Sequence, residues 1–243
     1  MPEYNIRLDP HNPGQFFACC GLFELCELLQ PGGEADFSDQ GRRFRVRSAA
    51  ALPIPLALED ETVDPRPSAA LEPLVLSAAG SRFVLDWWLN ETWTDKSTLK
   101  TWGGQQTPRR MLQELLSLLD QRAFPHQLFD YAAYTKTRFG VDARSAWSAI
   151  DAGYSPNDLG QPAATYPWVE VLAVIGMQGF RPASAGRNQL RYSLWLAPLT
   201  LPSARAAAAA PWQGLPHRSY TFQIALRGQG YKTFQFAQGE NHV

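Results

Sequence analysis

The first thirty residues change from one hydrophobic period to another. Tyr4, Ile6 and Leu8 alternate with Asn5 and Arg7, and this two-residue period is typical of a half-buried strand. From residue 13 the apolar positions repeat every three to four residues until "QPGG" at 30–33. This spacing predicts a helix that ends at about residue 30.

The start of that helix has its own signals. Asn12 is a good N-cap, and Pro13 suits the first helical position. Gln15 stands at the third helical position, where we expect its side chain to reach back to the cap as in a capping box.

All three cysteines lie on the apolar stripe of the same helix. A free cysteine on such a face behaves as a small hydrophobic residue, so we predict that Cys19, Cys20 and Cys26 pack in the core. A metal site and a cysteine nucleophile are the less favoured alternatives, because no CxxC spacing is present. The four histidines are scattered without ligand spacing, and no metal or other cofactor is predicted; they are His11, His126, His217 and His242.

Later segments predict a mixed fold. Residues 36–48 and 220–237 have the pattern of hairpins, 74–88 and 191–199 that of strands, and 107–120 that of an amphipathic helix capped by Thr107. Residues 165–182 predict a buried helix or strand, and the acidic, Pro-rich residues 51–73 predict a loop. We expect one α+β domain over 1–243, an antiparallel sheet with packed helices, with an RRM- or ferredoxin-like arrangement elaborated into two lobes as one form of it.

Charge is distributed unevenly along the 243 residues. The net charge is −1, but residues 1–75 carry 6 basic and 12 acidic side chains, whereas residues 96–144 carry 8 basic and 4 acidic ones. This basic middle segment predicts a local anion-binding face. The apolar runs are too short to span a bilayer, the start lacks a secretory signal, and the odd cysteine number fits a reducing compartment. We therefore expect a cytoplasmic protein without a membrane partner.

The most unusual segment combines tryptophans, glycines and cations. Four of the eight tryptophans lie within residues 87–102, and "GGQQ" at 103–106 leads into the helix capped by Thr107. Such a loop offers N–H groups and cations to phosphate, and tryptophans stack on bases; the alternative is that the tryptophans are core anchors and the lysines a solvated face. The loop lacks GxxxxGK, which disfavours an NTPase. The candidate nucleic-acid-binding residues are Lys96, Lys100, Trp102, Gly103, Gly104, Gln105, Gln106, Arg109, Arg110, Lys136, Arg138, Arg144, Arg187 and Arg191.

Two aspartates need a separate interpretation. Asp142 and Asp151 are nine residues apart in a loop-like segment, which is a weak signal for a catalytic carboxylate pair. We favour a structural role for them, in capping and in pairing with arginine.

Several long blocks of the chain resemble one CRISPR-associated family, the third of the Csb families, from type I-G (formerly I-U) systems. The blocks are "NPGQFFACCGLFEL", "DWW" followed by "LKTWGGQQ", "RFGVDARSAWSAIDAGYSPND", "TYPWVEVLAVIGMQGFRP" and "YSLWLAPLTLPSARAAA". The resemblance implies a subunit of the crRNA-guided, Cascade-like surveillance complex in antiviral defence, comparable to a reduced large subunit. Its implied partners are crRNA and target DNA, the Csb/Cas backbone and cap subunits, and the helicase–nuclease that the complex recruits. It carries no catalytic residue over to this chain.

Three functional hypotheses follow. The favoured one is a non-catalytic nucleic-acid-binding subunit, because a guide complex must hold backbone and shape while base pairing supplies sequence. The second is a crRNA-processing endoribonuclease with His11 or His217 as general acid or base. The third is a structural bridge between Cas subunits, which would use the tryptophan-rich segment and the acidic loop near Glu59 and Asp64.

Overall fold

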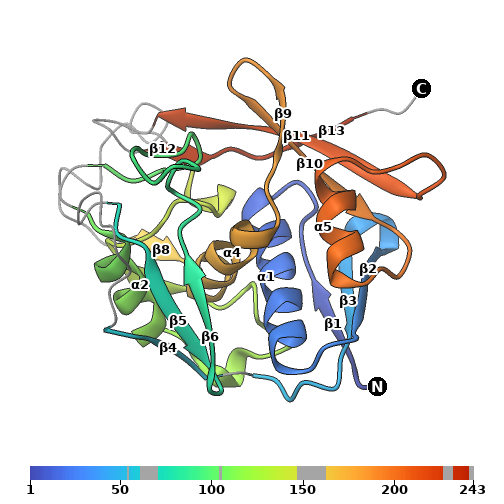
Figure 1. Ribbon diagram of the computed structural model, residues 1–243, viewed down its shortest axis with the longest axis horizontal. Helices are drawn as coiled ribbons and strands as arrows, with labels where there is room; N and C mark the ends of the chain where they lie inside the picture. The colour runs from blue at the N-terminus through green and yellow to red at the C-terminus, as the bar shows by residue number, and fades with distance from the viewer. Residues whose placement is uncertain (54, 61–70, 104–105, 147–162, 227–231, 241–243) are drawn as a thin grey trace.

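Two helices lie side by side at the centre of the protein. We describe a computed structural model, in which residues 1–53, 55–60, 71–103, 106–146, 163–226 and 232–240 are placed. Helices α1 (Pro13–Leu29) and α4 (Pro167–Gly179) pack closely against each other (Figure 1). A Cβ atom at Gly21 of α1 would collide with the carbonyl oxygen of Leu172, and one at Gly176 of α4 with that of Phe17. The two glycines therefore let the helix backbones touch.

Antiparallel sheets cover this pair from opposite sides (Figure 1). One has the order β1-β3-β2, built from β1 (Glu3–Arg7), β2 (Glu34–Ser38) and β3 (Arg43–Arg47). Another has the order β4-β5-β6, built from β4 (Leu56–Leu58), β5 (Leu74–Ala78) and β6 (Ser81–Leu85), with α2 (Pro108–Ser117) beside it. Strands β7 (Ala133–Thr135) and β8 (Ala163–Thr165) form a small pair.

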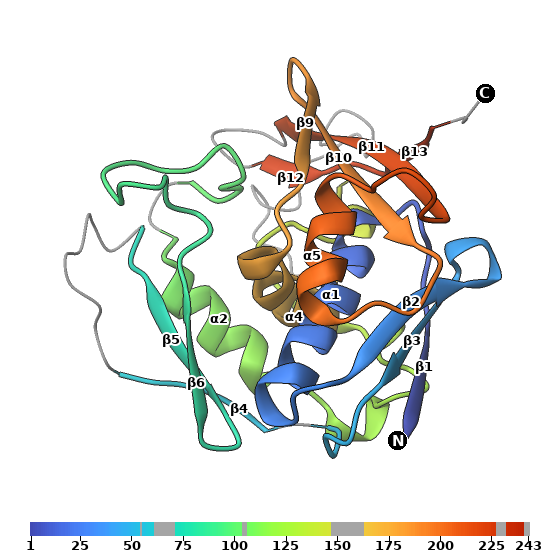
Figure 2. The ribbon, with the colours of Figure 1, turned by 45° about the vertical axis from the view of Figure 1, so that its right-hand side comes forward.

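The largest sheet lies over the N-terminal end of α1 (Figures 1 and 2). Its order is β12-β11-β10-β9, and β13 also pairs with β11. Tyr192 ties it to the helix, since its hydroxyl donates to the carbonyl of Pro10 and its ring stacks on Phe16. The members are β9 (Ala183–Gly186), β10 (Gln189–Trp195), β11 (His217–Leu226), β12 (Lys232–Phe234) and β13 (Gln238–Gly239), with α5 (Leu201–Ala209) against β10.

The structure confirms the predicted α+β class and most of the predicted elements. The predicted segment 165–182 contains the helix α4, and the hairpins at 36–48 and 220–237 are present, although residues 227–231 lie outside the described part. The described strands form several sheets, and the finer RRM- or ferredoxin-like arrangement in two lobes stays a prediction. So does the single domain, although the buried apolar cluster runs from Ile6 to Ala237.

The cysteines pack in the core, as predicted. Cys19, Cys20 and Cys26 are free and fully buried. Burial raises the pKa of the Cys26 thiol to about 12 and those of the other two well above their ordinary value, so the thiols stay protonated and unreactive.

Two local predictions were wrong. Gln15 does not close a capping box: its side-chain oxygen accepts a hydrogen bond from the N–H of Asp9 at 2.6 Å, while Asn12 caps α1 by accepting from Gly14. Residues 51–73 are not only loop, because β4 lies within them and pairs with β5; residues 54 and 61–70 lie outside the described part. Within the described residues, none of the helices combines the length and apolarity needed to cross a bilayer.

Candidate nucleic-acid interface

Three of the four tryptophans of the unusual segment are core residues, and the fourth, Trp93, is partly buried. Trp87, Trp88 and Trp102 are 0%, 0% and 4% exposed. Their rings meet edge to face, with centroids 5.4–6.0 Å apart, and Trp102 also packs on Phe139. The expectation that Trp102 stacks on bases is therefore wrong, because its faces are covered. The alternative interpretation of these side chains as core anchors is correct.

Three of the predicted phosphate-binding arginines are buried or half-buried and contact other groups of the protein. Arg109 pairs with Glu72 at 3.0 Å, and Arg144 pairs with the fully buried Asp142 at 2.7 Å. Arg138 is 8% exposed, and its burial lowers the pKa of its guanidinium. The prediction that these arginines form a solvent-facing phosphate grip is therefore wrong, because Arg109 and Arg144 pair with carboxylates of the protein and Arg138 is buried.

Other predicted residues lie on the surface or outside the described part. Arg110 is exposed on α2, and Lys136 is exposed just after β7. Gly103 and Gln106 are half-buried and joined by a backbone hydrogen bond of 3.4 Å. Gly104 and Gln105 lie outside the described residues.

Lys96 and Lys100 remain from the first predicted group, and the fold adds Lys232 to them. The Lys100 ammonium donates to the carbonyl of Trp102 and lies 4.7 Å from the centroid of that ring. Partial burial is the main cause that lowers the pKa of Lys100 to about 8, with smaller contributions from the positive charges of Lys96 and Lys232. We call Lys96, Lys100 and Lys232 the lysine cluster. None of them forms a salt bridge with a carboxylate of the described residues.

Sequence reasoning missed Lys232 because it is far away in the chain. It is the first residue of β12, and its backbone N–H donates to the carbonyl of Thr101 at 2.8 Å. This hydrogen bond places the start of β12 beside the segment that contains Lys96 and Lys100. The alternation in "YKTFQFA" predicts a strand there, but only the long-range pairing reveals which surface the lysine joins.

A groove of about 360 Å³ opens beside the lysine cluster. Arg187 stands in the β9–β10 turn between two of the lining residues, so the structure brings this predicted cation to the same region. Arg191 lies further along β10 and is half-buried, and its Nε atom has no hydrogen-bond partner in the described part of the chain. The lining residues are Thr98, Ser184, Gly186, Asn188, Gln189, Leu190, Ile224 and Lys232.

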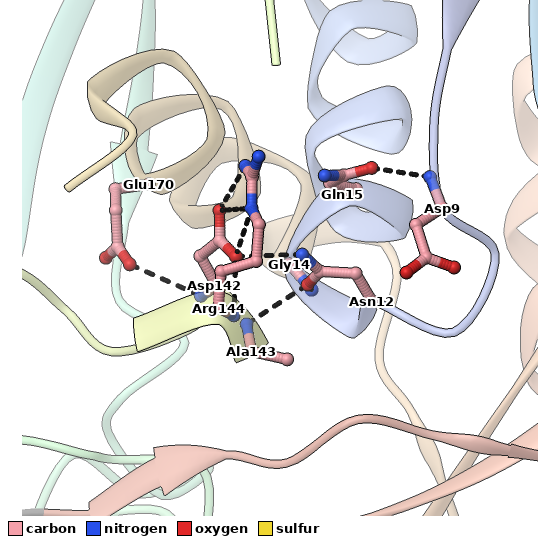
Figure 3. Close-up of polar contacts among 8 residues, drawn as sticks. All are labelled: Asp9, Asn12, Gly14, Gln15, Asp142, Ala143, Arg144 and Glu170. Carbon is pink, nitrogen blue, oxygen red and sulfur yellow. Dashed lines mark hydrogen bonds and ion pairs between the residues drawn. The ribbon is translucent and has the colours of Figure 1, made fainter. Parts of the chain in front are cut away.

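A second polar region lies inside the protein, where α1, α4 and η3 (Ala143–Ser145) meet (Figure 3). Asn12 accepts hydrogen bonds from the N–H groups of Gly14 and Ala143 at 3.0 and 3.1 Å, and it donates to Asp142 at 2.8 Å. Asp142 in turn holds the guanidinium of Arg144. We call Asn12, Asp142, Arg144 and Glu170 the buried junction. The favoured structural role of Asp142 is confirmed; Asp151 lies outside the described residues.

Glu170 supports the same junction from the first turn of α4. Its carboxylate accepts from the N–H groups of Phe139, Gly140 and Asp142 at 2.7, 3.1 and 3.2 Å. Complete burial raises the pKa of Glu170 to about 7, with a further contribution from the negative charge of Asp142. The carboxylate is thus a fixed acceptor for the backbone of 139–142, and the Glu170 side chain is fully buried.

The remaining candidates for chemistry are dispersed. The Nδ1 of His11 lies 2.9 Å from the carbonyl of Ala237, and that of His217 lies 2.8 Å from the carbonyl of Leu215. The described residues contain no group of three or more histidine, cysteine or acidic side chains that could hold a metal ion.

In comparisons with known proteins, the chain matches no family model and no curated protein.

Proposed function

We propose that this protein is a non-catalytic nucleic-acid-binding subunit of a type I-G CRISPR surveillance complex, holding crRNA or target DNA through the lysine cluster. The observation that carries the proposal is that Lys96, Lys100 and Lys232 converge beside a groove without a carboxylate partner among the described residues. The complex itself is proposed from the sequence resemblance described above.

The electrostatics of the cluster favour an anionic ligand. The positive charges of Lys96 and Lys232 act unfavourably on the Lys100 ammonium, and a phosphate placed among the three amines offsets that repulsion. Lysine binds phosphate as a flexible point charge, which suits a sugar–phosphate chain read without sequence specificity. A guide complex needs contacts of this kind, because base pairing supplies its sequence recognition.

The buried carboxylates support a non-catalytic role. The carboxylate oxygens of Asp142 and Glu170 accept hydrogen bonds from the backbone of 139–144, and both side chains are buried, so neither faces a substrate. The endoribonuclease and structural-bridge hypotheses remain as outcomes that the experiment below distinguishes.

Binding of the purified full chain to a labelled repeat–spacer RNA and to the matching single-stranded DNA, measured by fluorescence anisotropy, tests the proposal. Three phosphate contacts predict a slope of about −2 for the logarithm of affinity against that of salt, a fall of roughly 20-fold between ~50 and ~200 mM. Replacing Lys96, Lys100 and Lys232 by Gln should remove most of that slope. The control replaces three exposed cations elsewhere, Arg7, Arg110 and Lys136, by Gln, with the same change in net charge.

Equal slopes for the two variants would overturn the assignment to the lysine cluster. Specific cleavage of the repeat RNA by the wild-type chain would replace the non-catalytic proposal by the endoribonuclease. Assembly of the chain with the other subunits but no binding or crosslinking to nucleic acid would favour the structural bridge.

A further inference from the structure

The groove beside the lysine cluster has a mixed lining. Leu190 and Ile224 contribute apolar surface, whereas Asn188 and Gln189 contribute amide groups that both donate and accept hydrogen bonds. Hydroxyl groups come from Thr98 and Ser184. This combination of apolar contact and paired donors and acceptors matches an aromatic heterocycle with polar edges, and a nucleobase is such a group.

The walls of the groove are fixed by backbone structure. Leu190 pairs with Phe222 across β10 and β11, so its position follows the register of the largest sheet. Asn188 has a left-handed backbone with φ of 60°, which the tight β9–β10 turn imposes. Lys232 is held by its hydrogen bond to Thr101. The groove is therefore preformed, and a ligand does not have to order it.

We propose that this groove receives one unstacked base of a single-stranded nucleic acid while the lysine cluster binds the adjoining phosphates. The inference rests on the proposed function, and it adds the strandedness of the ligand. The volume of about 360 Å³ lies at the small end of the ~300–1,000 Å³ range of ligand sites, so it suits a ligand of nucleotide size.

A duplex does not satisfy the same groove. Within a duplex the base faces are stacked and the Watson–Crick edges are paired, so neither the apolar residues nor the amides of the groove have a partner. An unpaired strand exposes both surfaces. The lysines alone would bind the phosphates of either form.

The test compares three probes on the full chain: a single-stranded DNA of about 12 nucleotides, within the site sizes of ~4–16 known for single-strand binders, an abasic strand of the same length, and the corresponding duplex. We expect the base-containing strand to bind about tenfold more tightly than the abasic strand or the duplex. All three should keep the salt dependence that the phosphates cause.

The double variant Asn188→Gly with Gln189→Ala should lower the affinity for the base-containing strand to that of the abasic strand without changing the salt slope. Glycine keeps the left-handed turn, so the amide is removed without straining the backbone. Gln40→Gly is the matched control, because Gln40 is also polar and left-handed (φ of 57°) but lies in η1 (Asp39–Gly41) between β2 and β3. Circular dichroism checks that each variant folds.

The outcomes separate the two proposals. Equal affinities of the wild type for the abasic and base-containing strands, with the salt slope intact, would overturn the base pocket and leave the proposed function standing. Absence of salt-dependent binding to every probe would overturn the proposed function itself. An unchanged preference in the Asn188 and Gln189 variant would also overturn the pocket.

Discussion

The lysine cluster and the buried junction contain cations from the same basic stretch of the chain, yet their environments are opposite. In the junction, Arg144 is paired with Asp142, and its guanidinium lies 3.2 Å from the ring centroid of Tyr166. In the cluster, the charges that lower the pKa of Lys100 are those of two further lysines. The basic character of residues 96–144 therefore does not mark one surface. What distinguishes the two regions is whether the fold brings a carboxylate to each cation.

The type of cation agrees with this division. Arginine presents a planar fork that fits one carboxylate in a fixed geometry, and Arg144 uses its Nε and Nη2 in this way. Lysine is a flexible point charge that adapts to a mobile phosphate chain. We expect substitutions in the junction to change stability, and substitutions in the cluster to change binding.

Asp142→Ala should have the largest effect. It leaves the partly buried guanidinium of Arg144 and the amide of Asn12 without their acceptor, which costs about 3–5 kcal/mol of unfolding free energy. Urea denaturation measures this loss, and nucleic-acid affinity at low temperature should stay within about twofold of wild type. Arg43→Ala, which breaks an exposed pair with Asp39 at 3.8 Å, is the control and should cost less than about 0.5 kcal/mol.

A loss of affinity in Asp142→Ala that exceeds the fraction unfolded would contradict the separation of the two regions, because it would place Asp142 in the binding surface.

Glu170→Gln tests the junction through pH. The pKa of Glu170 is raised from 4.5 to about 7 by burial, so the folded state binds more protons than the unfolded state between these values. Wild-type stability should therefore fall as pH rises, by about 3 kcal/mol between pH 4.5 and 7. Glu170→Gln has no carboxyl group at this position, so its stability should lack this dependence on pH.

At acidic pH the variant should be about 1–2 kcal/mol less stable than wild type, because its amide donor meets the N–H of Asp142. Because the wild type loses about 3 kcal/mol between pH 4.5 and 7, the order of the two stabilities should reverse within this interval, and the variant should be the more stable protein above pH 7. Parallel pH profiles of the two proteins would contradict the burial of a titrating carboxylate at this position.

The sequence was most informative where local rules decide the structure. The cap at Asn12, the helix after Thr107 and the burial of the cysteines all depend on residues within one or two turns of each other. The predicted capping box at Gln15 does not form, because the Gln15 side-chain oxygen accepts a hydrogen bond from the more distant N–H of Asp9. The strand β4 was hidden by the prolines that precede it, Pro53 and Pro55, since only pairing with β5 makes it a strand.

The candidate site was less predictable for a physical reason. Whether a cation binds a ligand depends on its neighbours in space, and those come from remote segments: Glu72 for Arg109, and Lys232 for Lys100. Trp102 shows the same limit, because its burial depends on Trp87, Trp88 and Phe139 together. Sequence spacing placed Lys96, Lys100 and Trp102 in one segment but did not show which of their side chains face outward.

Lys100 should make binding depend on pH. Its pKa is lowered to about 8, so its positive charge is lost as pH rises through 8, and affinity for a single strand should fall by up to about tenfold between pH 7 and 9. Lys100→Arg keeps the charge over this range and should flatten the profile. Anisotropy titrations at constant ionic strength measure both, and the same pH dependence in the two proteins would remove Lys100 from the binding surface.

Arg187→Gln should have the smallest effect that still distinguishes the groove from the rest of the surface. Arg187 is exposed in the turn that lines the groove, so it acts as a rim charge that speeds association more than it holds the complex. We expect about threefold weaker binding, caused by a slower association rate in stopped-flow measurements. Arg110→Gln on α2 removes an equally exposed charge and should leave the rate unchanged. A larger loss for Arg110→Gln than for Arg187→Gln would move the binding face from the lysine cluster to α2.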